Sequence, residues 1–286
     1  MPDFGIMRGF NEKLFGDKLV AGQLPTQLGL IGSIDFEFDP DAKAFFDRVT
    51  AAGGTLSATE KAAVNTLVVQ MKTDGIWSGM KAIYPMVGAS AAACAQNLKS
   101  SSFTGTFTSG WTFASTGITG NATSTSFNTT LVPLTSLSLS SGHISIYSRS
   151  NIEAADCDIG SDSGASGGLS GNEQVILSRF PTLGFVAVYG TYNGAVTNSN
   201  SQGMYITNRN STTNTSQYKN GVNVRDVIQT SGLASNALTI GAESGRTRYT
   251  SRQYAFASIG DGLTDTQASN FYTAVQAFQT TLSRQV

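Results

Sequence analysis

Histidine is almost absent from this sequence. His143 is the single histidine in 286 residues, and Cys94 and Cys157 are the only two cysteines. Two cysteines by themselves make neither a disulfide framework nor a zinc site. A nucleophile–histidine–acid triad would have to use His143, and no Gly-x-Ser-x-Gly motif lies near it. The composition therefore favours a protein that is not an enzyme, with His143 as a structural residue.

Charge is also scarce. Charged residues make up 13% of the chain, about half the usual share, and the formal net charge is −1. Without a basic excess, a nucleic-acid backbone is not an expected partner. No apolar run reaches about 18 residues, so we expect no membrane span. The N-terminus lacks a basic stretch followed by an apolar one, so we expect no secretory signal.

The composition changes near residue 100. Residues 1–99 hold 19 of the 37 charged residues, and Ser and Thr supply 57 of the 187 residues that follow. A long Ser/Thr/Gly-rich segment with short apolar stretches is typical of an all-β sandwich. Disorder is the alternative, but alternation such as Ile144-Ser145-Ile146-Tyr147 argues against it.

Regularly spaced short strands are expected in this second part. The Asn220-Gly221 pair favours a type I′ hairpin between two of them. Two packed antiparallel sheets follow from this number of strands. The predicted strands are 103–108, 111–114, 125–131, 142–149, 174–180, 183–190, 203–208, 215–219, 222–229, 236–243 and 252–259.

Helices are expected in two places. Asp39-Pro40 begins one that ends before Gly53-Gly54, and Ser57 with Glu60 has the capping-box spacing that begins a second. Residues 39–75 therefore form a helical hairpin, which must bury its apolar face on the sandwich or on another subunit. Thr264 and Gln267 repeat the capping-box spacing, which predicts a C-terminal amphipathic helix at 264–282.

The first 38 residues combine scattered apolar side chains with frequent glycine, and neither a helical nor a strand period persists. We expect this segment to be an extended arm that orders against another surface; a strand-and-loop segment on its own domain is the alternative. The predicted domains are thus the arm at 1–38, the hairpin at 39–75 and the sandwich with its C-terminal helix at 76–286.

Two family resemblances add to this interpretation. The runs Gly203-Met204-Tyr205-Ile206, Tyr218-Lys219-Asn220-Gly221, Leu238-Thr239-Ile240-Gly241-Ala242 and Phe256-Ala257-Ser258-Ile259-Gly260 resemble the second half of laminin-G-like (concanavalin-like) jelly rolls. This implies a mainly β fold, a concanavalin/laminin-G-like antiparallel β-sandwich.

The second resemblance covers more of the chain. The runs Gly75-Ile76-Trp77-Ser78, Met80–Gly88 and Phe271–Thr280 are similar to tailed-phage virion proteins of Bacteroidetes phages, of the fibre, spike or decoration type. It implies a virion protein assembled in the host cytoplasm, in the head or the tail. Its arm would dock on other virion proteins by burying Phe10, Leu14 and Phe15. We also expect a homo-oligomer, with a trimer as one candidate, through the remaining apolar face of the hairpin.

Candidate ligand residues gather in two loop regions. Exposed aromatic and amide side chains suit sugars, which points to Tyr192, Asn193, Asn208, Arg209 and Asn210, with Tyr189, Asn198 and Asn200 nearby. The alternative is that the tyrosine is in the core and the asparagines form turns.

The most acidic loop carries Asp156, Asp158 and Asp162, which could supply three oxygens to Ca²⁺. The spacing does not match an EF-hand, and a plain polar loop is the alternative. We expect no other cofactor.

Paired carboxylates for glycoside hydrolysis are not evident, because Glu153, Glu173 and Glu243 are isolated in sequence. The expected function is therefore non-enzymatic. The resemblance implies a virion structural protein that presents a lectin-like sandwich, with a cell-surface glycan as the candidate ligand. A free bacterial carbohydrate-binding module or adhesin is the alternative, and a polysaccharide-degrading enzyme is the third hypothesis.

Overall fold

A computed structural model describes residues 38–162, 172–228, 232–244 and 248–286. The chain divides into two units, residues 1–37 and 38–286. The predicted arm, with Phe10, Leu14 and Phe15, lies outside the described residues. The hairpin predicted as a separate domain belongs to the same unit as the sandwich.

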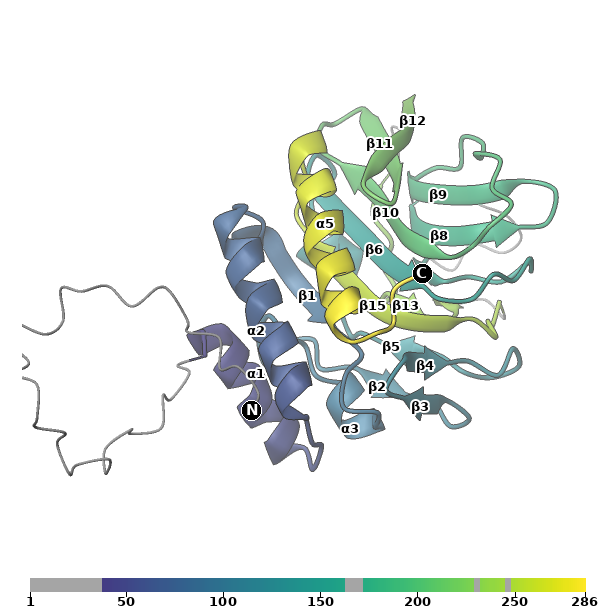
Figure 1. Ribbon diagram of the computed structural model, residues 1–286. Helices are drawn as coiled ribbons and strands as arrows, with labels where there is room; N and C mark the ends of the chain where they lie inside the picture. The colour runs from purple at the N-terminus through teal and green to yellow at the C-terminus, as the bar shows by residue number, and fades with distance from the viewer. Residues whose placement is uncertain (1–37, 163–171, 229–231, 245–247) are drawn as a thin grey trace, which may run out of the picture. The chain divides into compact units, whose positions relative to one another are not determined.

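Two sheets form the sandwich, as predicted (Figure 1). In the described ranges, one sheet contains β1 (Met80–Tyr84), β3 (Thr112–Ala114), β4 (Gly117–Thr119), β6 (Gly142–Ser148), β10 (Gly203–Arg209), β11 (Asn214–Lys219), β12 (Val222–Ile228) and β15 (Gln253–Gly260). The other contains β2 (Thr106–Phe107), β5 (Phe127–Asn128), β7 (Ile159–Ser161), β8 (Glu173–Phe180), β9 (Gly184–Gly190), β13 (Thr239–Ile240) and β14 (Glu243–Ser244). We refer to them as sheet A and sheet B.

Nearly all strand pairs are antiparallel. Sheet A runs in the order β12-β11-β10-β6-β15-β4-β3, and β1 also pairs with β15. Sheet B runs β2-β5-β13-β7-β8-β9, with β14 added to β7 as a parallel neighbour. The neighbours β6, β10 and β15 are far apart in sequence, so the sheet depends on long-range pairing.

The sandwich core lies between the two sheets. Sheet A contributes Ile144, Ile146 and Tyr205, and sheet B contributes Ile176 and Phe185, all buried. These positions alternate along each strand with residues on the opposite face, as the pleat of a β-strand requires. The alternation visible in the sequence thus corresponds to real inward and outward faces.

Three helices cover the outer face of sheet A: α1 (Pro40–Ala51), α2 (Ala58–Thr73) and α5 (Asp265–Thr281) (Figure 1). The remaining helical segments are short: η1 (Trp77–Gly79), α3 (Ala91–Cys94) and α4 (Pro133–Ser136). Phe45, Leu67 and Phe271 of the long helices share one cluster with Tyr147 and Phe256 of the sheet. The hairpin therefore packs on its own sandwich.

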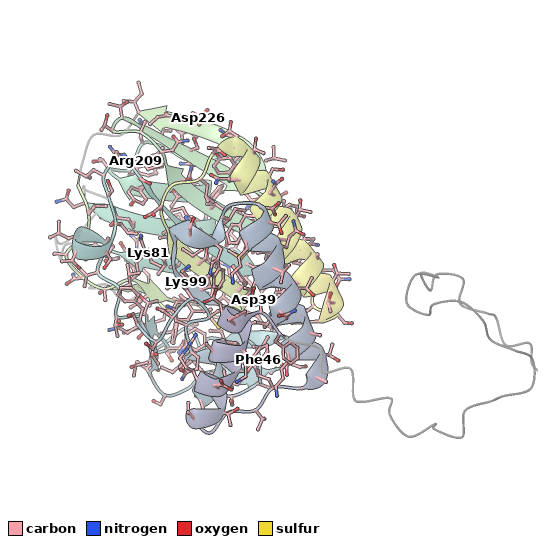
Figure 2. The ribbon with its side chains drawn as sticks, turned by 90° about the vertical axis from the view of Figure 1, so that its left-hand side faces the viewer. Asp39, Phe46, Lys81, Lys99, Arg209 and Asp226 are labelled. Carbon is pink, nitrogen blue, oxygen red and sulfur yellow. The ribbon has the colours of Figure 1, made fainter. Side chains whose placement is uncertain are left out.

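The helix boundaries follow the predicted caps. The Asp39 carboxylate accepts the Asp41 backbone N–H and an ammonium hydrogen bond from Lys72 at 2.7 Å. Figure 2 shows Asp39 and Phe46 on this helical layer. Both predicted capping boxes, Ser57–Glu60 and Thr264–Gln267, are present. These local predictions are confirmed because capping depends on residues within one turn.

The hairpin offers little free apolar surface for a second subunit. Val69, at 46% exposure, is the one large apolar side chain exposed on α1 or α2 in the described residues. The apolar stripe that we expected another copy to cover is already used by sheet A and α5. Oligomerisation remains a prediction, without this support.

The strand predictions fail mainly in length and continuity. Residues 103–108 and 125–131 shrink to the two-residue strands β2 and β5, and β4 and β7 were not predicted. Predicted strand 236–243 is interrupted at Gly241, whose φ of +76° breaks the extended backbone. A side chain there would meet the ring of Trp111 at 2.5 Å, so tertiary packing forces the break. The type I′ turn is confirmed, with Asn220 and Gly221 both at positive φ.

In the ranges described above, no helix is long and apolar enough to cross a membrane.

Candidate functional site

Two of the predicted sugar-binding residues, Asn208 and Arg209, are buried and form hydrogen bonds to the protein's own backbone. Asn208 is fully buried, and its side chain donates to the Leu263 carbonyl at 2.8 Å and accepts the Leu263 N–H at 2.7 Å. Arg209, labelled in Figure 2, is 1% exposed and donates to the carbonyls of Tyr189, Ser211 and Thr212. The prediction is wrong for both, because their polar groups are used inside the protein.

The other three members of that set lie nearer the surface. Asn193 and Asn210 are exposed, and Tyr192 is half-buried against the outer face of sheet B. Asn193 donates to the Ile228 carbonyl at 3.2 Å, and Asn210 donates to the Leu263 carbonyl at 3.3 Å. Their role in sugar binding remains a prediction.

The positive charge beside the acidic loop comes from a side chain of the protein, Arg252. Asp156 and Asp158 are buried and both contact the guanidinium of Arg252, which is also fully buried. Asp162 lies apart, with the Asn236 amide 3.5 Å from its carboxylate. Across the described residues, no three His, Cys, Asp or Glu side chains are grouped to hold a metal ion. The three aspartates therefore do not come together as the predicted calcium site.

Two carboxylates share one guanidinium in this cluster, so one negative charge is left over in a buried place. Burial, reinforced by the neighbouring Asp158, raises the pKa of Asp156 to about 6. The Tyr254 hydroxyl donates to Asp158 at 2.7 Å, and Arg252 also donates to the carbonyls of Ile152 and Arg179. The cluster thus fastens the acidic loop to β8 and β15.

His143 is structural, as expected from the sequence. Its ring is completely buried, with Nδ1 donating to the Asp261 carbonyl at 2.6 Å and Nε2 accepting from the Ser258 hydroxyl at 3.0 Å. Burial lowers the pKa of His143 to about 4, so the ring stays neutral at pH 7. The acceptor on Nδ1 is a main-chain oxygen rather than a carboxylate, which does not complete a catalytic triad.

These two groups predict opposite pH dependences. His143 contributes stability above pH 6.5 that is lost as the pH falls towards 4, about 3 kcal/mol in all. Asp156, with its raised pKa, contributes stability below pH 3.8 that is lost as the pH rises towards 6. We expect His143→Gln to become relatively more stable from pH 6 to 4, and Asp156→Asn relatively less stable, each compared with the parent.

Urea unfolding at every half pH unit from pH 4 to 7 would measure the free energy of unfolding of the parent and of both variants. The readout is the slope of the unfolding free energy against pH, which is independent of any constant loss from the substitution. Slopes that shift in the same direction in both variants would contradict the assignment.

A hollow at the end of the helical layer has few side chains that could select a ligand. It has a volume of about 670 Å³ and lies among the α1–α2 turn, Gly88 and Ala89, Ser115 and the end of α5. Glu60 is the one charged side chain among its described lining residues. Its carboxylate already accepts hydrogen bonds from the Ser57 backbone N–H and hydroxyl, and from the Gly88 N–H at 2.7 Å. No aromatic ring is among its described lining residues, so we do not place the site there.

A smaller hollow on the sandwich has richer chemistry. It has a volume of about 240 Å³ and lies beside the turn between β8 and β9, where β9 forms the edge of sheet B (Figure 1). We call it the β8–β9 hollow; its described lining residues are Glu153, Arg179, Phe180, Thr182, Leu183, Gly184, Thr197, Asn198 and Ser199. One aromatic ring, one guanidinium, one carboxylate, an amide and three hydroxyls therefore meet in one concave place.

The charged pair in the β8–β9 hollow is held by the fold. Arg179 is the second-last residue of β8, and its guanidinium lies 3.1 Å from the Glu153 carboxylate and donates to the Asn151 side chain at 3.0 Å. The Arg179 carbonyl accepts the Ala154 N–H at 3.2 Å, which aligns residue 153 with the strand end. Glu153 remains half exposed and Arg179 about one quarter exposed, so both can reach a ligand.

The rest of the lining is anchored from behind. Asn198 donates to the Ser178 carbonyl and to the Tyr205 hydroxyl, and its oxygen accepts from Lys219 at 2.6 Å. Arg248 lies 5.9 Å from the centre of the Phe180 ring. Leu183, at the tip of the turn, is 41% exposed.

The sequence indicated only part of this hollow. Asn198 was among the polar loop residues, whereas Arg179 and Phe180 sit at the end of a predicted strand and gave no separate signal. Glu153 was isolated in sequence, and only the fold brings it beside Arg179. A strand that ends in Arg-Phe beside a Pro-Thr turn is a weak sequence indication at most.

No protein-family model and no curated protein match this sequence. Among solved structures, the chain is similar to domain 4 of AbnA, an extracellular GH43 arabinanase from Geobacillus stearothermophilus, solved in complex with arabinotriose. The TM-score is 0.50 at 10% identity, over 68% of this chain and 98% of that domain. At this identity the likeness shows the fold alone: both chains form a β-sandwich.

Two sialidases match less well. The Trypanosoma rangeli sialidase gives a TM-score of 0.40 at 9% identity, over 74% of this chain and 39% of the enzyme. A NanB sialidase variant from Streptococcus pneumoniae gives 0.39 at 13% identity, over 53% of this chain and 26% of the enzyme.

Proposed function

We propose that this chain is a non-enzymatic carbohydrate-binding protein whose sandwich takes a saccharide in the β8–β9 hollow. The observation that carries the proposal is the set of side chains in that hollow. An aromatic ring can pack on the apolar face of a sugar, while guanidinium, carboxylate and hydroxyl groups match its hydroxyls. The similar domain of the arabinanase was solved with arabinotriose, which supports a saccharide as the ligand class.

Binding without hydrolysis fits the carboxylates of the hollow. Glycoside hydrolysis uses two carboxyl groups about 5–9.5 Å apart across the scissile bond. Glu153 is the one carboxylate among the described lining residues. Asp156 and Asp158, the next acids along the chain, are committed to the buried Arg252.

Binding by the full-length chain to an oligosaccharide array would test this proposal. We expect Arg179→Met and Phe180→Ala each to weaken binding at least tenfold, since each removes a main contact from the hollow. Tyr192→Ala and Asn210→Ala serve as matched controls in the other predicted loops, with thermal unfolding to confirm folding. Loss of binding in these two, with Arg179→Met unaffected, would move the site to those loops.

We further propose that the sandwich is displayed on a phage particle through residues 1–37. The resemblance of Met80–Gly88 and Phe271–Thr280 to tailed-phage virion proteins supports this placement. Immunogold electron microscopy with antibodies against residues 100–286 should label intact particles, at the tail tip for a receptor-binding role or over the head for a decoration role. Particles that contain the protein but remain unlabelled would contradict outward display.

A further inference from the structure

We propose that the β8–β9 hollow selects neutral saccharides with vicinal hydroxyls and discriminates against saccharides that carry carboxylate or sulfate groups. This inference rests on the proposed function and specifies its ligand class. It depends on the paired charges of Arg179 and Glu153.

The hollow is electrically balanced. Among the described lining residues, Arg179 and Glu153 are the two that carry charge, and they lie 3.1 Å apart. The guanidinium that could hold an anionic sugar is thus already neutralised by a carboxylate of the protein. An acidic sugar bound to Arg179 would come close to Glu153, and two like charges at that range repel each other.

The nearby cations do not offset this balance. Arg248, beside Phe180, faces the Glu243 carboxylate at 3.5 Å. Lys219, behind Asn198, donates its ammonium to the Asn198 side chain at 2.6 Å and to the Asn200 carbonyl at 2.8 Å. Both are turned towards acceptors of the protein, so within the described part of the chain Arg179 is the cation that meets the ligand.

The Arg179–Glu153 pair complements a vicinal diol. A guanidinium only donates hydrogen bonds and an ionised carboxylate only accepts them, whereas a sugar hydroxyl does both. Two adjacent hydroxyls can therefore use the pair together, one accepting from Arg179 and the other donating to Glu153, with charge-assisted strength. A carboxylate or sulfate group cannot donate to Glu153, which leaves that acid facing another anion.

The remaining lining is consistent with a neutral ligand. Thr182, Thr197 and Ser199 present hydroxyl groups, and Phe180 and Leu183 supply apolar surface. The volume of about 240 Å³ is below the range of drug-sized pockets, so roughly one sugar ring enters, from the end or side of a longer chain.

The test compares neutral oligosaccharides with their uronic-acid counterparts on the full-length chain by array and calorimetry. Wild type should bind a neutral member at least tenfold more tightly than its acidic counterpart. Glu153→Gln keeps an acceptor but removes the charge, so it should narrow or reverse that ratio. Asp47→Asn makes the same change of net charge on α1, where Asp47 is 66% exposed, and should leave the ratio unchanged.

The outcomes separate the two proposals. Equal or tighter binding of the acidic saccharides by wild type would overturn the selectivity while leaving carbohydrate binding intact. A ratio that changes equally in Asp47→Asn would mean that net charge, rather than the hollow, sets it. No binding to any saccharide would overturn the proposed function, and this inference with it.

Discussion

Replacing Arg252 with methionine is expected to lower the free energy of unfolding by about 3–5 kcal/mol, the range found when one partner of a buried ion pair is removed. The substitution leaves Asp156 and Asp158 buried without their cation. It also removes the donors to the Ile152 and Arg179 carbonyls, so the acidic loop loses part of its attachment to β8. Urea or guanidinium unfolding followed by fluorescence would measure the loss.

A matched control is present in the same region. Arg179→Met also removes an arginine, but its ion pair with Glu153 is partly exposed, so we expect a loss below about 1 kcal/mol. Adding Asp156→Asn and Asp158→Asn to Arg252→Met should recover part of the stability, since the unpaired charges are then gone. A single variant at Arg252 as stable as the parent would show that the cluster contributes little.

Replacing Arg284 with methionine is expected to destabilise the protein by about 3 kcal/mol, since it leaves three buried oxygens, those of Pro85, Met86 and the Gln279 side chain, without this donor at about 1 kcal/mol each. Arg284 is fully buried, and its guanidinium donates to the carbonyls of Pro85, Met86 and Ala255 and to the Gln279 side chain. Burial lowers the pKa of Arg284 to about 10, so it remains charged at pH 7.

The effect should extend beyond global stability. Met86 has a φ of +48°, a left-handed backbone that costs roughly 1–2 kcal/mol outside glycine. Arg284 holds that strained segment against the end of α5, so its loss should also speed amide hydrogen exchange around residues 85–90. The adjacent exposed Gln285→Ala is the control and should change neither quantity. Unchanged exchange at 85–90 in Arg284→Met would contradict this holding role.

The burial of these two arginines, and the large effect expected from replacing either, could not be predicted from the sequence. Arg252 and Arg284 occur in polar stretches that resemble solvated surface, and arginine is rarely fully buried. Two of the carbonyls that accept from Arg284 are far from it in sequence: Pro85 is 199 positions away and Ala255 is 29 positions away. Both come beside Arg284 only in the folded chain. Partners at such separation leave no local pattern.

In the candidate site, too, some residues could be predicted from the sequence and others could not. The acidic loop was visible as three aspartates, and oxygen ligands for a cation were a reasonable interpretation. In the structure the positive charge beside these aspartates is that of Arg252, the residue immediately before β15. In the β8–β9 hollow, Asn198 was visible as a loop residue, whereas the contact of Glu153 with Arg179 depends on the path of the acidic loop along β8.

Features that depend only on neighbours within one turn or one strand could be predicted from the sequence. The caps at Asp39, Ser57 and Thr264, the Asn220-Gly221 turn and the alternation of the long strands all appear as predicted, because each interaction spans only a few residues. Together they were enough to indicate a β-sandwich with a helical layer. Tertiary structure alone decided which polar side chains were buried, as for Asn208 and Arg209, and which met in a hollow, as for Glu153 and Arg179. The reason is physical: burial and pairing depend on strands such as β6, β10 and β15 that become neighbours only when the whole sheet forms.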